Sequence, residues 1–206
     1  MPTRFEEHWN QLYRVKSAAE LSWYESHSRR SLQSIQEIGV SSDAPILDVG
    51  GGASVLVDDL LSLGYADVTV LDLAPAALAQ SRERLGAAAQ RVTWIATDVT
   101  TFRPTRRYAV WHDRGVLHFL LSSSEQEQYV AVLRSALASG GHVIVATFGP
   151  DGPIRCSGLP VQCYSAEMIS SLLGEGFELR GSVLEDHHSP AGVAQQFLYT
   201  RWQAVA

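Results

Sequence analysis

The stretch from residue 45 to 54 constrains the fold of this chain more than any other part of the sequence. An apolar run, 46–49, contains one acid, Asp48, and is followed directly by three glycines, and a helical apolar pattern then covers 55–63. Glycines allow a tight turn and a close approach of the backbone to a ligand. A run of this kind therefore predicts a buried strand, a turn and the start of a helix.

Apolar runs and helical patterns alternate through the middle of the chain. Strand-like runs are expected at 46–49, 68–71, 92–95, 108–111, 141–148, 177–184 and 194–202, and helices at 55–63, 75–85, 125–137 and 166–173. This alternation predicts βαβ units and a parallel sheet covered on both faces. The last two runs, joined by a polar turn at 186–192, predict an antiparallel pair. The expected fold is α/β: a Rossmann-like, doubly wound, seven-stranded, mostly parallel sheet with an antiparallel C-terminal strand.

Two amphipathic stretches precede the first strand. Apolar residues recur at helical spacing over 5–13 and again over 32–38, and Gly39 suits the end of the second helix. They predict an N-terminal helical cap or lid over residues 1–40, with the main domain at 41–206. We also expect Ser123 and Gln126 to form a capping box for the helix at 125–137.

Composition excludes several classes of function. The chain has 206 residues and a net charge of −6, so there is no basic field to attract nucleic acid. No apolar run approaches the roughly 18 residues that a membrane span needs, and no secretory signal is visible. Two cysteines are too few for a disulfide framework. We therefore expect a cytoplasmic protein without nucleic-acid or membrane partners, either a monomer or a homodimer.

A second acid supports a nucleoside-binding site. Asp72 ends the run 68–71 and lies about 20 residues beyond the glycines, the spacing at which a carboxylate accepts hydrogen bonds from ribose hydroxyls. A nicotinamide-binding domain would need a third glycine where Val55 stands, and Asp48 would repel a pyrophosphate. A carboxylate suits a cationic ligand better.

These motifs resemble class I S-adenosylmethionine-dependent methyltransferases, over nearly all of the chain from Ile46 to Trp202. The resemblance implies S-adenosyl-L-methionine as cofactor. It also implies that the glycine turn lies against the methionine and ribose portions of the cofactor. One acid would bind the ribose hydroxyls, and another would lie near the adenine amino group. The cofactor-binding residues implied in this way are Asp48, Gly50, Gly51, Gly52, Asp72, Leu73, Asp98 and Val99.

Three further segments, 8–13, 22–25 and 111–120, look like a bacterial subgroup related to thiopurine and thiol methyltransferases. Some protein lysine methyltransferases share a similar opening. The family has no common catalytic residue that could be carried over, so candidates for catalysis must come from the residues themselves.

Two such candidates follow the run 108–111. Asp113 lies where ligands of open α/β sheets bind and could neutralise the ammonium or sulfonium side of the cofactor, or simply cap a helix. His118 could act as a general base, or could be a histidine packed with its apolar neighbours. We predict both as catalytic residues.

The remaining candidates concern the acceptor. Trp23 and Tyr24 could form an aromatic lid, with Trp23 over the sulfonium and Tyr24 at the acceptor, or could pack between helices. Arg114 could bind an anionic acceptor or form an internal ion pair. Cys156, beside Arg155, could have a lowered pKa and react with a thiophilic centre. His187 and His188 lack the spacing of a closed metal site, and no metal is predicted.

The sequence thus predicts an enzyme, an S-adenosylmethionine-dependent methyltransferase acting on a small molecule through a thiol, another soft nucleophile or a carboxylate. A protein lysine methyltransferase and a non-catalytic S-adenosylmethionine-binding module are the alternatives.

Overall fold

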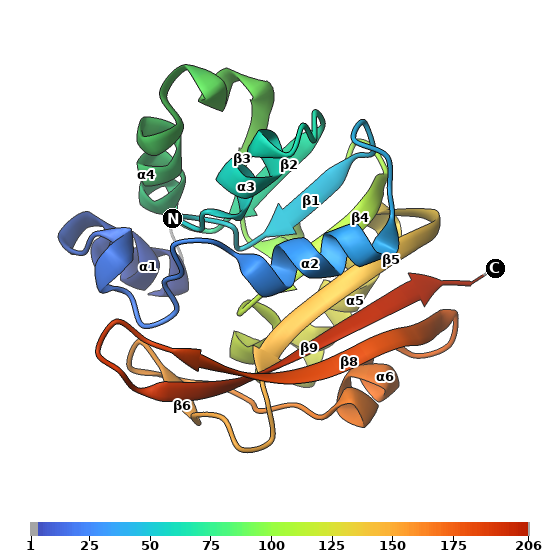
Figure 1. Ribbon diagram of the computed structural model, residues 1–206. Helices are drawn as coiled ribbons and strands as arrows, with labels where there is room; N and C mark the ends of the chain where they lie inside the picture. The colour runs from blue at the N-terminus through green and yellow to red at the C-terminus, as the bar shows by residue number, and fades with distance from the viewer. Residues whose placement is uncertain (1–3, 206) are drawn as a thin grey trace.

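The computed structural model describes residues 4–205, and a seven-stranded sheet forms its centre (Figure 1). The strand order is β3-β2-β1-β4-β5-β9-β8. The strands of this sheet are β1 Ile46–Val49, β2 Val68–Asp72, β3 Val92–Ala96, β4 Tyr108–Arg114, β5 Leu137–Phe148, β8 Phe177–His188 and β9 Ala194–Ala204.

The sheet is parallel from β3 to β5, and β9 runs antiparallel to both of its neighbours, β5 and β8. The predicted fold class is confirmed. The order reverses between β1 and β4, which lie side by side although β2 and β3 come between them in the sequence. Such a reversal opens a crevice at the carboxyl ends of the strands, where ligands of open α/β sheets bind.

Helices cover both faces of the sheet, as the alternating side chains of its strands require. Val110 and Ile144 point to the face covered by α2, α3 and α4, whereas Trp111 and Val145 point to the face covered by α5 and α6. The helices are α1 Arg4–Val15, α2 Arg29–Ile38, α3 Leu56–Ser62, α4 Pro75–Leu85, α5 Ser123–Ala136 and α6 Ala166–Leu173, with short 3₁₀ helices at Ala18–Glu20, Gly86–Arg91, Val99–Thr101 and Leu117–Phe119. Within residues 4–205 no helix is long and apolar enough to cross a membrane.

The two helices expected within residues 1–40 take different positions. α2 packs on the sheet through Ile35, which is fully buried. α1 instead lies against α4 (Figure 1), where Trp9 and Tyr13 join a cluster with Ala53 and Ala77. α1 therefore lies beside the glycine turn, whereas α2 packs on the sheet, and a domain boundary at residue 40 stays a prediction.

Two local expectations were wrong. The capping box of α5 is formed by Ser122 and Glu125, because the Glu125 carboxylate accepts hydrogen bonds from both the backbone N–H and the hydroxyl of Ser122. Gln126 instead donates to the Leu120 carbonyl. The polar turn expected at 186–192 is shorter, since β8 extends to His188. Within the long loop after β5 lies a small hairpin, β6 Arg155–Cys156 and β7 Leu159–Pro160.

Candidate active site

A cavity of about 180 Å³ lies at the carboxyl ends of the parallel strands. It brings together eleven of the fourteen residues predicted for the site. These are Trp23, Asp48, Gly50, Gly51, Asp72, Leu73, Asp98, Val99, Arg114, His118 and Cys156. Gly52, Asp113 and Tyr24 are not among the residues that line it.

The glycine turn has no room for side chains. A Cβ on Gly51 would lie 2.3 Å from Oδ2 of Asp48, and one on Gly52 would lie 2.6 Å from Oδ2 of Asp72. Gly50 has φ +67°, and its Cβ would lie 2.1 Å from a methyl group of Val116. The turn therefore runs directly over the carboxylates of β1 and β2. Gly52 lies against Asp72 but does not line the cavity.

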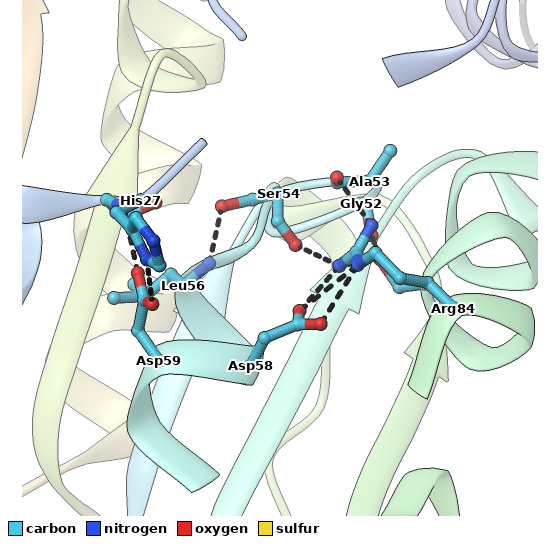
Figure 2. Close-up of polar contacts among 10 residues, drawn as sticks. His27, Gly52, Ala53, Ser54, Leu56, Asp58, Asp59 and Arg84 are labelled. Carbon is cyan, nitrogen blue, oxygen red and sulfur yellow. Dashed lines mark hydrogen bonds and ion pairs between the residues drawn. The ribbon is translucent and has the colours of Figure 1, made fainter. Parts of the chain in front are cut away.

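The turn is also held from outside by α4 (Figure 2). Arg84 donates hydrogen bonds to the carbonyls of Ala53, at 3.1 Å, and Ser54, at 2.6 Å, and pairs with Asp58 at 2.7 Å. Ser81 donates to the Gly52 carbonyl at 2.6 Å. These contacts hold three consecutive turn residues, 52–54, and the following helix α3 against α4, so the cavity wall is preformed.

Asp48 belongs to a buried chain of polar side chains that the sequence analysis missed. Its Oδ1 lies 2.7 Å from Nδ1 of His112, and Nε2 of His112 lies 2.8 Å from the hydroxyl of Ser31. The exposed fraction of each of the three residues is 2% or less. Among residues 4–205, Oδ2 of Asp48 has no hydrogen-bond partner. A buried carboxylate oxygen without a partner is energetically unfavourable and suits a ligand that donates or carries positive charge.

Asp72 is also a buried carboxylate. Its Oδ1 accepts a hydrogen bond of 2.7 Å from the Ala74 N–H. Burial, together with the nearby carboxylate of Asp48, raises the pKa of Asp72 to about 7. Asp98 at the end of β3 caps the 3₁₀ helix that follows, accepting from the backbone N–H and the hydroxyl of Thr100. The three acids therefore lie on the β1–β3 side of the cavity.

Aromatic rings line the β4–β5–β9 side of the cavity, and further rings from the N-terminal segment cover it. We call Trp9, Trp23, Phe119, Phe148 and Phe197 the aromatic wall. The centroid distances are 5.1 Å for Trp9–Phe119, 5.9 Å for Trp9–Trp23 and 4.9 Å for Phe148–Phe197. These rings come from five separate segments, and only Trp23 was predicted at the site.

His118 lies within this wall. Burial, with the Arg114 guanidinium as the smaller cause, lowers the pKa of His118 to about 3. An imidazole with so low a pKa accepts a proton poorly at neutral pH. The ring is 2% exposed and packs between Phe119 and Phe148, which fits the alternative of a histidine packed with its apolar neighbours, and a catalytic role for His118 stays a prediction.

Asp113 has no exposed surface and lies outside the cavity lining. Its Oδ1 accepts from the Val116 N–H, and its Oδ2 accepts from the Leu117 N–H and the Tyr129 hydroxyl. The capping alternative fits these contacts, and the predicted cofactor contact does not. Burial raises the pKa of Asp113 to about 6.

Arg114 forms the internal ion pair that the sequence analysis left as an alternative to anion binding. Its guanidinium donates to Tyr199 at 2.8 Å, to the Trp23 carbonyl at 3.1 Å and to Glu25 at 3.1 Å. Although burial alone would raise it, His187 and Arg114 hold the pKa of Glu25 below its usual value. Arg114 thus fixes the backbone beside Trp23, while Tyr24 lies outside the main cavity.

Cys156 was expected to have a lowered pKa, and that expectation is wrong. The side chain is 7% exposed, and burial raises the pKa of its thiol to about 11, more than the charge of Arg114 lowers it. It is therefore a weakly nucleophilic part of the cavity wall. Among residues 4–205 no group of three or more His, Cys, Asp or Glu side chains could hold a metal ion.

Replacing Arg114 with Met should destabilise the protein by about 2 to 3 kcal/mol, because it leaves Glu25 half-buried without its cation. Urea denaturation would measure this. The matched control is Arg180→Met, which removes an exposed pair with Glu178 and should change stability by less than about 0.5 kcal/mol. If both variants lost the same stability, the internal ion pair would not hold this segment.

Comparison with known proteins identifies the class. The family model described as a methyltransferase domain matches residues 46–141. Together with the strand order and the glycine turn, this match supports a class I S-adenosylmethionine-dependent methyltransferase, an enzyme whose cofactor is S-adenosylmethionine. The predicted class and cofactor are confirmed, and the finer resemblance to thiopurine and thiol methyltransferases stays a prediction.

The individual relatives are distant. The eEF1A lysine and N-terminal methyltransferase of Bos taurus is 24% identical over 139 residues, which are 67% of this chain but only 20% of that protein. The match therefore spans about a fifth of the curated relative.

Solved structures agree over more of the chain. A structure described by "Conversion of a Disulfide Bond into a Thioacetal Group during Echinomycin Biosynthesis" has a TM-score of 0.79 at 17% identity, covering 98% of this chain and 92% of that one. The 1,6-didemethyltoxoflavin-N1-methyltransferase of Burkholderia thailandensis, with its substrate and S-adenosylhomocysteine bound, has a TM-score of 0.69 at 20% identity, covering 98% and 84%. These likenesses establish the fold.

Proposed function

We propose that the chain transfers a methyl group from S-adenosylmethionine to an uncharged small molecule, at a thiol or another soft nucleophile. The observation that carries the proposal is a single cavity with two unlike sides. Three acids lie on its β1–β3 side, and the aromatic wall lies on its β4–β5–β9 side and on the N-terminal segment that covers it. Cationic and polar parts of a cofactor fit the first side, and an apolar acceptor fits the second.

The residues on the acidic side suit the cofactor. The unpaired Oδ2 of Asp48 would face the cationic methionine end, and Asp72 would accept hydrogen bonds from the ribose hydroxyls. Asp98, with Leu73 and Val99 beside it, would hold the adenine. When bound, S-adenosylmethionine supplies a methyl group on a cationic sulfur, already activated for displacement by a heteroatom.

The chain's own contribution is alignment and exclusion of water. The aromatic wall supplies a dry surface for the acceptor, and Trp23 offers a ring face to a cationic sulfur. Since the histidine in the wall is neutral and Arg114 is engaged by three partners, neither supports an anionic acceptor. Of the acceptors expected from the sequence, a carboxylate is therefore disfavoured.

A protein lysine methyltransferase is the second candidate, because the matched curated relatives carry that description. Incubating the pure enzyme and radiolabelled S-adenosylmethionine with a cell lysate separates the two. We expect label in low-mass products. Label in discrete protein bands would favour the lysine methyltransferase. No transfer, together with tight cofactor binding, would favour the non-catalytic module.

A further inference from the structure

His118 has only one of its two ring nitrogens satisfied by the protein. Its Nδ1 accepts a hydrogen bond from the Phe148 N–H at 3.4 Å. A neutral imidazole has one acceptor nitrogen and one N–H donor. Because the backbone occupies Nδ1 as an acceptor, the proton must lie on Nε2. His118 is therefore a fixed hydrogen-bond donor through Nε2–H.

This donor is buried without a partner. Nε2 of His118 is inaccessible to solvent and has no hydrogen-bond acceptor among residues 4–205. It lies beside Gly115, where a Cβ would come within 3.6 Å of it, and both residues line the cavity. Because Gly115 has no side chain, no Cβ occupies the space beside Nε2. A buried N–H left unpaired is energetically unfavourable, and a ligand atom that accepts its hydrogen bond would remove this cost.

The surroundings of this donor are flat and apolar. The Phe119 ring lies 4.5 Å from the imidazole at 81°, and the Phe148 ring lies 4.8 Å away at 42°. Phe148 packs in turn against the ring of Phe197, and the Arg114 guanidinium carbon lies 4.6 Å from the centroid of that ring. Rings so arranged favour a planar ligand that stacks against them or meets them edge to face.

We propose that the methyl acceptor is a flat, uncharged ring molecule carrying a hydrogen-bond acceptor, a ring nitrogen or a carbonyl oxygen, to which Nε2–H of His118 donates. The inference rests on the proposed function for the claim that the ligand is methylated. The claim about recognition rests on the cavity alone. His118 is then a specificity-determining residue that binds and orients the acceptor without moving a proton.

Two probes of nearly equal shape test this recognition. Isoquinoline has a ring nitrogen that accepts a hydrogen bond, and naphthalene has none. We expect isoquinoline to bind the protein saturated with S-adenosylhomocysteine about tenfold more tightly than naphthalene. His118→Phe should bring the two affinities within about twofold, whereas His118→Gln, which keeps a donor, should retain part of the difference. His188→Phe, on an exposed part of β8 outside the cavity, should leave the preference unchanged.

Equal binding of the two probes to the unaltered protein, or binding of neither, would overturn the proposal. The ¹⁵N spectrum of the His118 imidazole gives a second test that does not depend on a variant that folds. We expect the neutral Nε2–H form throughout pH 6 to 8, and a protonated ring or the Nδ1–H form would contradict the assignment. If S-adenosylhomocysteine does not bind, and the cofactor-free protein still binds isoquinoline more tightly than naphthalene, the proposed function fails and the recognition stands.

Discussion

Asp72→Asn is expected to weaken S-adenosylhomocysteine binding and, at the same time, to make the cofactor-free protein more stable above pH 7. The affinity should fall by about 1 to 3 kcal/mol if the carboxylate holds the ribose hydroxyls. A substitution that weakens ligand binding but stabilises the ligand-free protein is characteristic of a group that destabilises the fold and is needed for binding.

The sign of the stability effect follows from the raised pKa. Burial raises the pKa of Asp72 to about 7, whereas an aspartate in the unfolded chain titrates near pH 4. As the pH rises from about 4 to 7, the unfolded chain therefore loses this proton first, and the folded state loses stability. Above pH 7 the penalty is up to about 4 kcal/mol, which asparagine removes.

Urea denaturation at pH 5 and pH 8, and calorimetric titration with S-adenosylhomocysteine, would measure both effects. The control is Asp186→Asn, because Asp186 is exposed on β8 and lies outside the cavity. Unchanged affinity in Asp72→Asn would refute the ribose role. If Asp72→Asn were less stable than the unaltered protein at pH 8, the claim that the buried charge destabilises the folded state would be wrong.

Gly51→Ala is the second change with a large expected effect, and it should destabilise the protein by about 2 to 4 kcal/mol. The new methyl group would lie 2.3 Å from Oδ2 of Asp48 and 2.8 Å from a methyl group of Val70. Neither neighbour can move easily, because Val70 is fully buried and His112 holds the Asp48 carboxylate. We also expect cofactor affinity to fall, since relief of the clash displaces that carboxylate.

Gly64→Ala is the matched control. Gly64 has φ +88°, but a Cβ there would meet nothing within 4 Å. Its substitution should therefore cost only about 1 to 2 kcal/mol of backbone strain. Urea denaturation compares the two variants. Equal losses of stability, with cofactor affinity retained in Gly51→Ala, would show that the turn does not depend on its close contact with Asp48.

The sequence predicted best what depends on local pattern. Short apolar runs, the glycines after β1 and the acids at the ends of β1, β2 and β3 are each visible within a few residues. Because parallel strands bring their carboxyl ends to one edge, the sequence alone predicts Asp48, Asp72 and Asp98 around one cavity.

What the sequence did not reveal depends on contacts between distant segments. Ser31 lies 81 residues from His112, and the aromatic wall draws on residues as far apart as Trp9 and Phe197. The pKa of His118 depends on burial that no local pattern shows. The contact of the Asp113 carboxylate with Tyr129 on α5, 16 residues further along the chain, was hidden for the same reason. The one local signal for His112 was its position directly before Asp113, at the end of an apolar run.

Titration of the pure protein with S-adenosylhomocysteine at pH 6 and pH 8 tests the central claim, that the cavity at the strand ends is a cofactor site with Asp72 as a hydrogen-bond acceptor. We expect one binding site and a higher affinity at pH 8, because the carboxylate is ionised above its pKa of about 7. Absence of binding at both pH values would contradict the account, and so would an affinity that falls as the pH rises.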